Sequence, residues 1–348
     1  MIDFDNKEEL QKIDPQNTVL STENLVKQLE QAWKEVNEVT VTHKFSDIKN
    51  IVFCGMGASI YGALVLKALQ GKFMKYPSEV ISDYHLPEYV NHQTLVVLTS
   101  YSGSTEEVLS CAEEALSKQA KMVILTKGGE LAEFAKKHNI TAYIFDGKLN
   151  PSGTPRLGAG YTILGLLGLI DKTGILSLEE QELEDALKRL SQNQLSIREN
   201  ARKDYQKYIN KIPVIFAAEH LAGNAQIFRN QFNETSKSFS AFYLIPDLNH
   251  HLMEGLLFPT EAPLAFISFF SPNYSPKIQK RVKLTTEVVK QNKRTIEEYE
   301  TSGASMYDDF FEMLLYGSYV TLYLALYYNQ NPAINPWVDY FKNKLAEA

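Results

Sequence analysis

The sequence predicts an α/β protein built from two doubly wound units, each a parallel β-sheet flanked by helices. Short apolar runs bounded by Gly, Ser, Thr or Asp alternate with segments of helical periodicity, which is typical of parallel sheets covered on both faces. This alternation occurs twice along the chain. With 348 residues, 44% of them hydrophobic, the chain is long for a single core, so we expect two domains, residues 1–175 and 176–348.

The first unit is expected to contain four short strands, preceded by an amphipathic helix. The apolar residues between Leu25 and Val36 follow at spacings of four, four and three, which predicts a helix from Thr22 to about Val39. Thr22 is expected to cap this helix. The expected strands are Ile51–Cys54, Leu95–Leu98, Met122–Leu125 and Ala142–Phe145, and the expected helices are Ile60–Leu69, Glu106–Ser117, Leu131–Lys137 and Tyr161–Ile170.

The second unit repeats the pattern after a charged linking segment. Residues 178–208 are rich in Glu, Lys, Arg and Gln with periodic Leu, which indicates one or two helices. The uncharged, Tyr-rich run Met313–Tyr328 is expected to be a buried helix, because it is shorter than the roughly 18 apolar residues that suggest a membrane span. The expected strands are Pro213–Ala218, Ala241–Ile245 and Leu264–Phe269, followed by a helix that contains Ile278, Val282 and Val289.

Charge and composition argue against several functional classes. The formal charge of -7 argues against a protein that binds nucleic acid by neutralising phosphates. The two cysteines, Cys54 and Cys111, form neither a metal-ligand spacing nor a disulfide framework. The first residues lack the basic start and apolar core of a secretion signal, so we expect a cytoplasmic protein that does not bind membranes.

Two expected strand-to-helix turns have features of an anion site. In residues 54–59 (CGMGAS), a Gly-x-Gly pair lacks the third glycine of the dinucleotide fingerprint, so a nicotinamide site is poorly supported. The second turn, Thr99–Glu106, crowds hydroxyl side chains into the start of the next helix. Hydroxyls and unpaired N–H groups there suit a phosphate, although one Ser or Thr could serve as a cap alone. Two neighbouring turns favour a ligand, because open α/β sheets bind ligands at the carboxyl ends of their strands.

Three further residues are candidates for charge chemistry. Arg156 is the only charge between Lys148 and Asp171, so it needs an anionic partner, either a protein carboxylate or a ligand. Glu234 and His250 lie in one segment of the second unit, and both can move protons near pH 7. From the residues alone, Glu234 could also be a solvated helix residue and His250 part of a turn.

The segments GMGAS, SDYHLPEYV, TSYSGSTEEVL, ILTKGGELAEFA and GTPRLGAGY follow one another between residues 55 and 161. In that order they resemble the sugar isomerase (SIS) domain of bifunctional phosphoglucose/phosphomannose isomerases. SYSGST is the most telling segment, because SIS domains have a SYSGNT-like loop that holds the sugar phosphate. The resemblance covers most of the chain after the first fifty or so residues and implies two SIS domains. It implies that the phosphate is bound by Gly57, Ala58, Ser59, Ser100, Ser102 and Thr105.

The resemblance also implies roles for the charged residues of the site. Glu234 would carry a proton between C1 and C2 of the sugar, and Arg156 would stabilise the charge on the reacting carbons. His250 would help to open the sugar ring, and in relatives it reaches the site from the partner subunit. Lys342, in a short helix near the end of the chain, would also enter the site. Lys344 is the alternative, and a solvated lysine is possible for either.

Three positions depart from the family pattern. Asp247 and His251 replace a Glu and an Asn on either side of His250, which affects the shape of that loop but not the identity of the proton-moving groups. Ala58 stands where relatives usually have a second Gly. If that residue requires a positive φ, Ala would cost about 1 kcal/mol and shift the turn.

These expectations describe a homodimeric aldose-ketose isomerase of carbohydrate metabolism. It would interconvert glucose 6-phosphate or mannose 6-phosphate with fructose 6-phosphate through an enediolate, without a metal or another cofactor. Two alternatives stay open, a non-catalytic SIS-domain regulator that binds sugar phosphates and an amino-sugar phosphate isomerase. The presence of Glu234 and His250 and the lack of a helix-turn-helix module disfavour the regulator. Turnover of glucosamine 6-phosphate would favour the amino-sugar isomerase.

Overall fold

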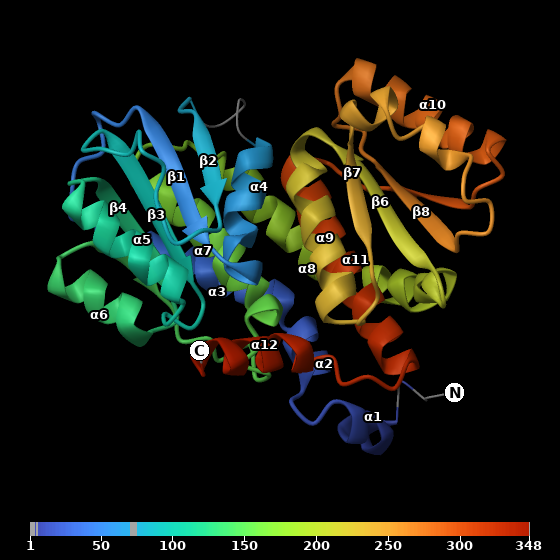
Figure 1. Ribbon diagram of the computed structural model, residues 1–348, viewed down its shortest axis with the longest axis horizontal. Coiled ribbons are helices and arrows are strands. Elements are labelled where there is room, and N and C mark those ends of the chain that lie inside the picture. Colours follow the sequence, from blue (N-terminus) through green and yellow to red (C-terminus); the bar gives the residue numbers. More distant parts are fainter. Residues whose placement is uncertain (1–3, 5, 70–74, 348) are drawn as a thin grey trace.

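Two parallel sheets lie side by side in the computed structural model, which describes residues 4, 6–69 and 75–347 (Figure 1). Over these residues, the first sheet has five strands in the order β2-β1-β3-β4-β5, and the second has four in the order β7-β6-β8-β9. All neighbouring strands run parallel. The strand order of the second sheet matches that of the first, except that its described residues include no counterpart of β5. The α/β class with two parallel sheets is therefore confirmed, and the second unit is a shortened copy of the first.

In the first half, each of the four apolar runs forms a strand. The edge strand β2 (Ser78–Ile81) was not predicted, because it is only half buried and contains a glutamate. The other elements, with short 3-10 helices labelled η, are α1 (Lys7–Ile13), α2 (Thr18–Glu23), α3 (Leu25–Asn37), β1 (Asn50–Gly55), η1 (Gly57–Ile60), α4 (Tyr61–Leu69), β3 (Thr94–Ser100), α5 (Glu106–Ser117), β4 (Lys121–Thr126), α6 (Gly129–Lys137), β5 (Thr141–Ile144), η2 (Pro155–Gly158) and α7 (Ala159–Lys172).

The helix expected from Thr22 to Val39 is interrupted, and the capping prediction is wrong. Asn24 separates α2 from α3. Thr22 lies inside α2, where its hydroxyl donates to the Thr18 carbonyl at 2.9 Å, so it does not cap α3. The apolar spacing marks the buried face of a helix rather than its first residue. That face is confirmed, since all four apolar residues of the spacing are buried.

In the second half, the charged linking segment forms one long helix and a short 3-10 turn. The edge strand β9 (Ile296–Glu300) was not predicted, because its sequence IEEYE alternates exposed glutamates with apolar residues. The other elements are α8 (Glu180–Asp204), η3 (Tyr205–Tyr208), β6 (Ile212–Ala218), η4 (Glu219–Leu221), α9 (Ala222–Glu234), β7 (Ala241–Ile245), η5 (Asp247–His250), η6 (Glu254–Leu256), β8 (Leu264–Phe270), α10 (Pro276–Gln291), α11 (Met306–Tyr327) and α12 (Pro336–Ala346).

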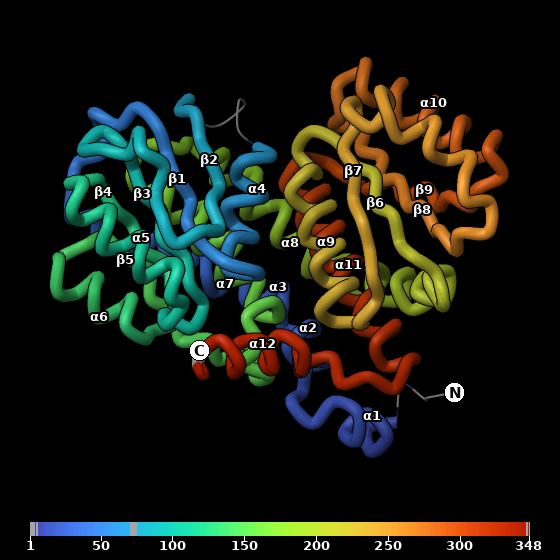
Figure 2. The backbone as a smooth tube through the Cα atoms, in the orientation of Figure 1, coloured from blue at the N-terminus to red at the C-terminus, as the bar shows by residue number. Residues whose placement is uncertain are grey.

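The helices between the two sheets join them into one continuous core. Helices α5 and α6 pack on one face of the first sheet, and α4 and α7 lie against its other face. Helix α4 also packs against α9 of the second half, and both lie between the sheets (Figures 1 and 2). The same buried cluster includes Leu95 of β3 and Phe266 of β8. The domain boundary between residues 175 and 176 stays a prediction.

Helix α11 is the most deeply buried long helix of the second half. It packs against α8 and α9, which confirms the buried helix expected at Met313–Tyr328, although the helix begins earlier, at Met306. Of the described helices, it is the one long and apolar enough to cross a membrane. Inside the fold, 89% of its most apolar 18-residue window is buried, as in the core helix of a globular protein.

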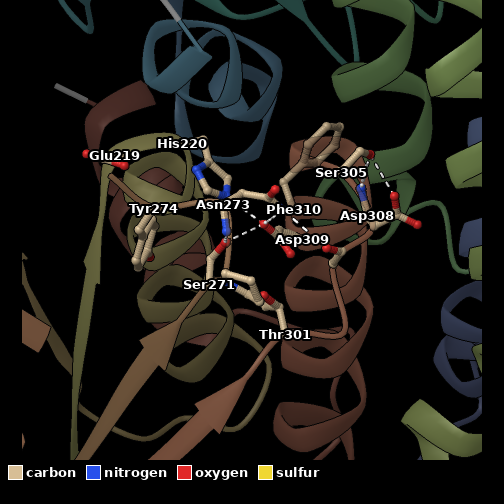
Figure 3. A network of polar contacts seen from close by, with 12 residues as sticks. Glu219, His220, Ser271, Asn273, Tyr274, Thr301, Ser305, Asp308, Asp309 and Phe310 are labelled. Atoms are coloured by element: carbon tan, nitrogen blue, oxygen red, sulfur yellow. Dashed lines mark hydrogen bonds and ion pairs between the residues drawn. The ribbon is translucent and has the colours of Figure 1, made fainter. Parts of the chain in front are cut away.

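A buried carboxylate, Asp309, lies at the carboxyl edge of the second sheet (Figure 3). Its Oδ2 lies 2.8 Å from Nε2 of His220, and it accepts from Oγ of Ser271 at 2.5 Å and from Nδ2 of Asn273 at 2.9 Å. His220 follows β6 and Ser271 follows β8, so one side chain from the first turn of α11 joins the ends of two strands. The members of this cluster come from distant segments, so no local pattern of residues predicts it.

The hydrogen bonds determine the ionisation of Asp309. Burial alone would raise the pKa of Asp309, but hydrogen bonds from His220, Ser271, Asn273 and Thr301 outweigh burial and lower the pKa below its ordinary value. A carboxyl group with a lowered folded-state pKa binds its proton more weakly than in the unfolded chain. The stability that Asp309 contributes is therefore complete at neutral pH and is lost as the pH falls below about 4.

We predict that Asp309→Ala lowers the free energy of unfolding by about 3–5 kcal/mol, because it leaves buried donors without their acceptor. Urea unfolding at pH 7 measures this change. The control is Asp185→Ala on α8, whose carboxylate pairs with Lys188 at the surface, and we expect a change within about 0.5 kcal/mol. A loss below about 1 kcal/mol for Asp309→Ala would contradict the prediction.

Candidate functional site

Two turns at the carboxyl edge of the first sheet contain the residues predicted to bind phosphate. The first turn is η1, between β1 and α4, and the second is the segment 100–105, from the last residue of β3 to the start of α5. The backbone N–H of Tyr101 donates to Oγ of Ser59 at 3.0 Å, so the two turns are directly joined. Strands β1 and β3 flank the point where the strand order reverses, and doubly wound sheets bind ligands at such points.

The hydroxyl groups of the second turn bond to one another and to the turn itself. Ser100 Oγ lies 2.7 Å from Thr105 Oγ1 and accepts from the N–H of Gly103 at 3.0 Å. Ser102 is exposed, and its Oγ accepts from Oγ of Ser104 at 3.1 Å. Thr105 stands at the N-cap of α5, but its side chain makes no capping hydrogen bond. Capping alone therefore does not account for these hydroxyls, and their arrangement suits an anion at the start of α5.

In the first turn, the left-handed backbone belongs to Gly57 and not to Ala58. Gly57 has a φ of 55°, whereas Ala58 is buried inside η1 without a positive φ. The strain considered for an alanine at this position therefore does not arise.

Arg156, in η2, is buried where three distant segments of the chain meet. Its Nε donates to Oγ1 of Thr235 at 3.2 Å, and its Nη1 lies 3.5 Å from Oε2 of Glu234. Its Nη2 donates to the carbonyl of Pro332 and, at 2.9 Å, to the carbonyl of Ala333. Of the two partners left open by the sequence, a protein carboxylate is thus present. The structure brings two of the predicted catalytic residues, Arg156 and Glu234, into an ion pair.

This ion pair lies beside the first turn. Burial lowers the pKa of Arg156, and the carboxylate of Glu234 and the phenol of Tyr61 partly oppose that effect. Tyr61 follows Ser59 by two residues, is fully buried and has a pKa raised by burial and then by the charge of Glu234. In addition, η1 contacts both η2 and α9. The first turn, the guanidinium and the carboxylate therefore border one region, while the side chain of Glu234 stays 31% exposed.

Two more side chains border the ion pair. With its oxygen turned toward Arg156, the side-chain amide of Asn335 accepts from Nη1 at 2.9 Å, and its nitrogen donates to the backbone carbonyl of Glu234 at 3.3 Å. Nζ of Lys237 donates to the backbone carbonyl of Glu234 at 2.5 Å. No role was predicted for Asn335, because a polar residue before a proline carries no signal of a partner a hundred positions away.

His250 and Glu234 lie at opposite ends of one strand. Glu234 ends α9, which leads into the amino end of β7, whereas His250 lies in η5 beyond the carboxyl end of β7. The five residues of β7 span about 16 Å. Within one chain, therefore, the fold does not bring the exposed His250 to the ion pair, and its predicted role stays a prediction.

The two candidate lysines are both exposed on α12. Lys344 pairs with Glu347 at 2.6 Å. Lys342 stands about 10 Å along the helix axis from Asn335, which itself contacts Glu234. The entry of Lys342 into the site, or of Lys344 as the alternative, stays a prediction.

Known proteins resemble this chain along almost its whole length. Residues 44–144 match the SIS domain family, and residues 198–345 match the family described as bacterial phospho-glucose isomerase C-terminal SIS domain. A bifunctional phosphoglucose/phosphomannose isomerase from Caldicellulosiruptor bescii is 32% identical over 94% of this chain and 98% of its own. Another from Aquifex aeolicus is 28% identical over 93% of this chain and 98% of its own. The crystal structure of a hypothetical protein from Thermus thermophilus covers 98% of this chain and 94% of its own, with a TM-score of 0.73 and 16% identity, and so shares the fold.

We predict that Gly103→Ala weakens the binding of inorganic phosphate at least about tenfold. Gly103 has a φ of 76°, and a Cβ there would collide with the carbonyl of Gly128, so the second turn has to move. Isothermal titration calorimetry measures the affinity. Gly174→Ala is a matched control, because Gly174 has the same φ of 76° with no atom within 4 Å of the added Cβ. Unchanged phosphate affinity in Gly103→Ala would contradict a phosphate site at this turn.

Proposed function

The chain belongs to the bifunctional phosphoglucose/phosphomannose isomerase family, and we propose that it interconverts glucose 6-phosphate and mannose 6-phosphate with fructose 6-phosphate. Family membership makes the chain an enzyme, a sugar-phosphate isomerase. The observation that carries the choice of reaction is the ion pair of Arg156 and Glu234 beside the turn of Ser59, which is joined to the hydroxyl-rich second turn. Proton transfer between neighbouring carbons needs a base, a nearby positive charge and a fixed substrate, and this region offers all three.

The phosphate of the sugar is proposed to bind at the two turns. The hydroxyls of Ser59, Ser100, Ser102 and Thr105 and the backbone around Gly57 and Ala58 would hold it at the start of α5. This contact is remote from the reacting carbons. Its binding energy would hold C1 and C2 against the carboxylate of Glu234.

Glu234 is proposed to move the proton. Starting from the open-chain aldose, its carboxylate takes the proton from C2, and the electron pair of that bond forms the C1–C2 double bond of an enediolate with the negative charge on O1. Glu234 then returns the proton to C1. O1 gains a proton and O2 loses one, which leaves the ketone at C2. Because Glu234 is partly exposed and held by Arg156 at 3.5 Å, it can face a ligand while it stays oriented.

Arg156 is proposed to stabilise the enediolate. All three nitrogens of its guanidinium group already bond to the protein, and Nη1 is the one that contacts Glu234. A charge that is fixed before the reaction needs no reorganisation when the oxygen becomes negative. Since removal of one such donor typically costs roughly 10²–10³ in rate, this contact is a large part of the proposed catalysis.

Ring opening is proposed to need a second copy of the chain. His250 would reach the ion pair of the partner subunit, since it is separated from its own Glu234 by the length of β7, and Lys342 would assist it. The exposed apolar side chains near these residues support a homodimer. They are Leu257 (56% exposed) and Phe258 (71%) after η5, and Trp337 (82%) and Phe341 (64%) on α12. A cytoplasmic role in glycolysis or gluconeogenesis agrees with the proposed substrates.

We predict that Glu234→Gln lowers kcat/KM about 10³-fold or more, because the amide cannot accept the proton. The assay uses fructose 6-phosphate with separate detection of glucose 6-phosphate and mannose 6-phosphate. Wild type is expected to form both products. The control is Glu287→Gln, an exposed residue of α10. A wild type that binds sugar phosphate without forming either product would overturn the proposed function.

We predict that mixing two inactive variants restores activity if His250 acts across the dimer. A mixed dimer of Glu234→Gln and His250→Gln chains has one site with both native residues and one site with neither. Random pairing of equal amounts, after mild denaturation and refolding, then gives about a quarter of wild-type activity. Each variant refolded alone is the control. No recovery in verified mixed dimers would place His250 in its own subunit's site or outside the chemistry.

A further inference from the structure

Lys237 has a backbone conformation that lysine rarely adopts. Its φ is 57°, in the left-handed region, which costs a residue with a Cβ about 1 kcal/mol. Of the eight described non-glycine residues with a positive φ, four are Asn, the residue that tolerates this region best. The left-handed turn sends the side chain of Lys237 back over the end of α9. There its Nζ donates to the carbonyl of Glu234 at 2.5 Å.

Termination of the helix alone does not explain this lysine. A basic side chain often bonds the last carbonyls of a helix, but it usually does so at the surface. Lys237 is half buried, and two charged groups act on it, Arg156 from η2 and Glu234 from the end of α9. Tyr61 of α4 lies near both of those groups. Burial, and then the charge of Arg156, lowers the pKa of Lys237 to about 8, with Glu234 opposing the shift.

A second lysine in the chain shows the ordinary case. Lys293 follows α10, has a φ of 58° and is exposed. Its N–H donates to the carbonyl of Lys290 at 2.9 Å, so the helix ends without a buried ammonium group. The same backbone turn is thus made without placing a cation beside an arginine. The burial of Lys237 needs a separate reason.

We propose that Lys237 is a positioning residue for the isomerisation, which fixes the main chain at Glu234 and adds a second positive charge beside Arg156. This inference rests on the proposed function. Before proton transfer, the carboxylate of Glu234 faces both cations. After proton transfer, Glu234 is neutral and the negative charge lies on the enediolate. Two fixed cations stabilise that charge better than one, because the half-buried site screens them less than bulk water does.

The test replaces Lys237 with glycine, which suits a positive φ and therefore keeps the turn. For Lys237→Gly we expect kcat with fructose 6-phosphate to fall about 10- to 100-fold, with KM changed less than about threefold. Urea unfolding is expected to show no loss of stability. Lys293→Gly is the matched control, since it makes the same backbone change at an exposed lysine, and its kcat should equal that of wild type.

The pH profile of kcat separates the charge from the shape of the residue. Lys237 loses its proton above about pH 8, so wild-type kcat should fall there. Lys237→Arg should recover at least part of the activity and move that fall to higher pH, because arginine stays charged. In Lys237→Gly the fall near pH 8 should be absent.

The possible results distinguish the role of Lys237, the contribution of its charge and the proposed function. A Lys237→Gly variant with kcat within twofold of wild type would overturn the role of Lys237 and leave the proposed function standing. A Lys237→Arg variant no more active than Lys237→Gly would overturn the charge contribution. A wild type without isomerase activity would overturn the proposed function and this inference together.

Discussion

One buried guanidinium joins the three parts of the chain that border the site. Arg156 comes from the first half, Glu234 and Thr235 from the end of α9, and Pro332 and Ala333 from the segment before α12. A buried charge is costly unless it is paired and hydrogen-bonded, so these segments cannot separate without exposing or stranding it. A contact that links the two halves and the C-terminal segment is therefore also the contact proposed to stabilise the reaction intermediate.

The two sheets share a strand order but carry opposite chemistry at their carboxyl edges. The first edge presents hydroxyl groups and glycine-containing turns, which suit an anion. At the second edge, the carboxylate of Asp309 takes the donors of His220 and Ser271, and Glu219 accepts from the N–H of Ser275 before α10 at 2.9 Å. An edge that already contains two carboxylates repels an incoming phosphate. The two halves thus use the same edge differently: the first is the proposed anion site, and the second is a buried network of hydrogen bonds.

The charged groups around Glu234 leave the region with a net positive charge. Two cations, Arg156 and Lys237, face one carboxylate, and the partly exposed position of Glu234 leaves it open to a ligand. The exposed His250 and the apolar side chains of α12 lie outside this arrangement in a single chain. The proposed dimer would complete the site and cover those apolar side chains in the same step, which links assembly to activity.

The sequence alone determined the class of fold and most of the strands, because central parallel strands are buried on both faces and must be continuously apolar. It missed β2 and β9, whose edge positions allow glutamates, and it misplaced the cap at Thr22. The residues nominated Arg156, Glu234 and the two turns, and the resemblance implied a role for each. The tertiary structure brought Arg156 and Glu234 together beside the first turn. Only that structure decided that Asn335 and Lys237 border the ion pair and that His250 lies at the far end of β7. Lys237 is 81 positions from Arg156 and Asn335 is 101 positions from Glu234, and the place of His250 depends on strand direction. A local pattern of residues carries no information about such contacts.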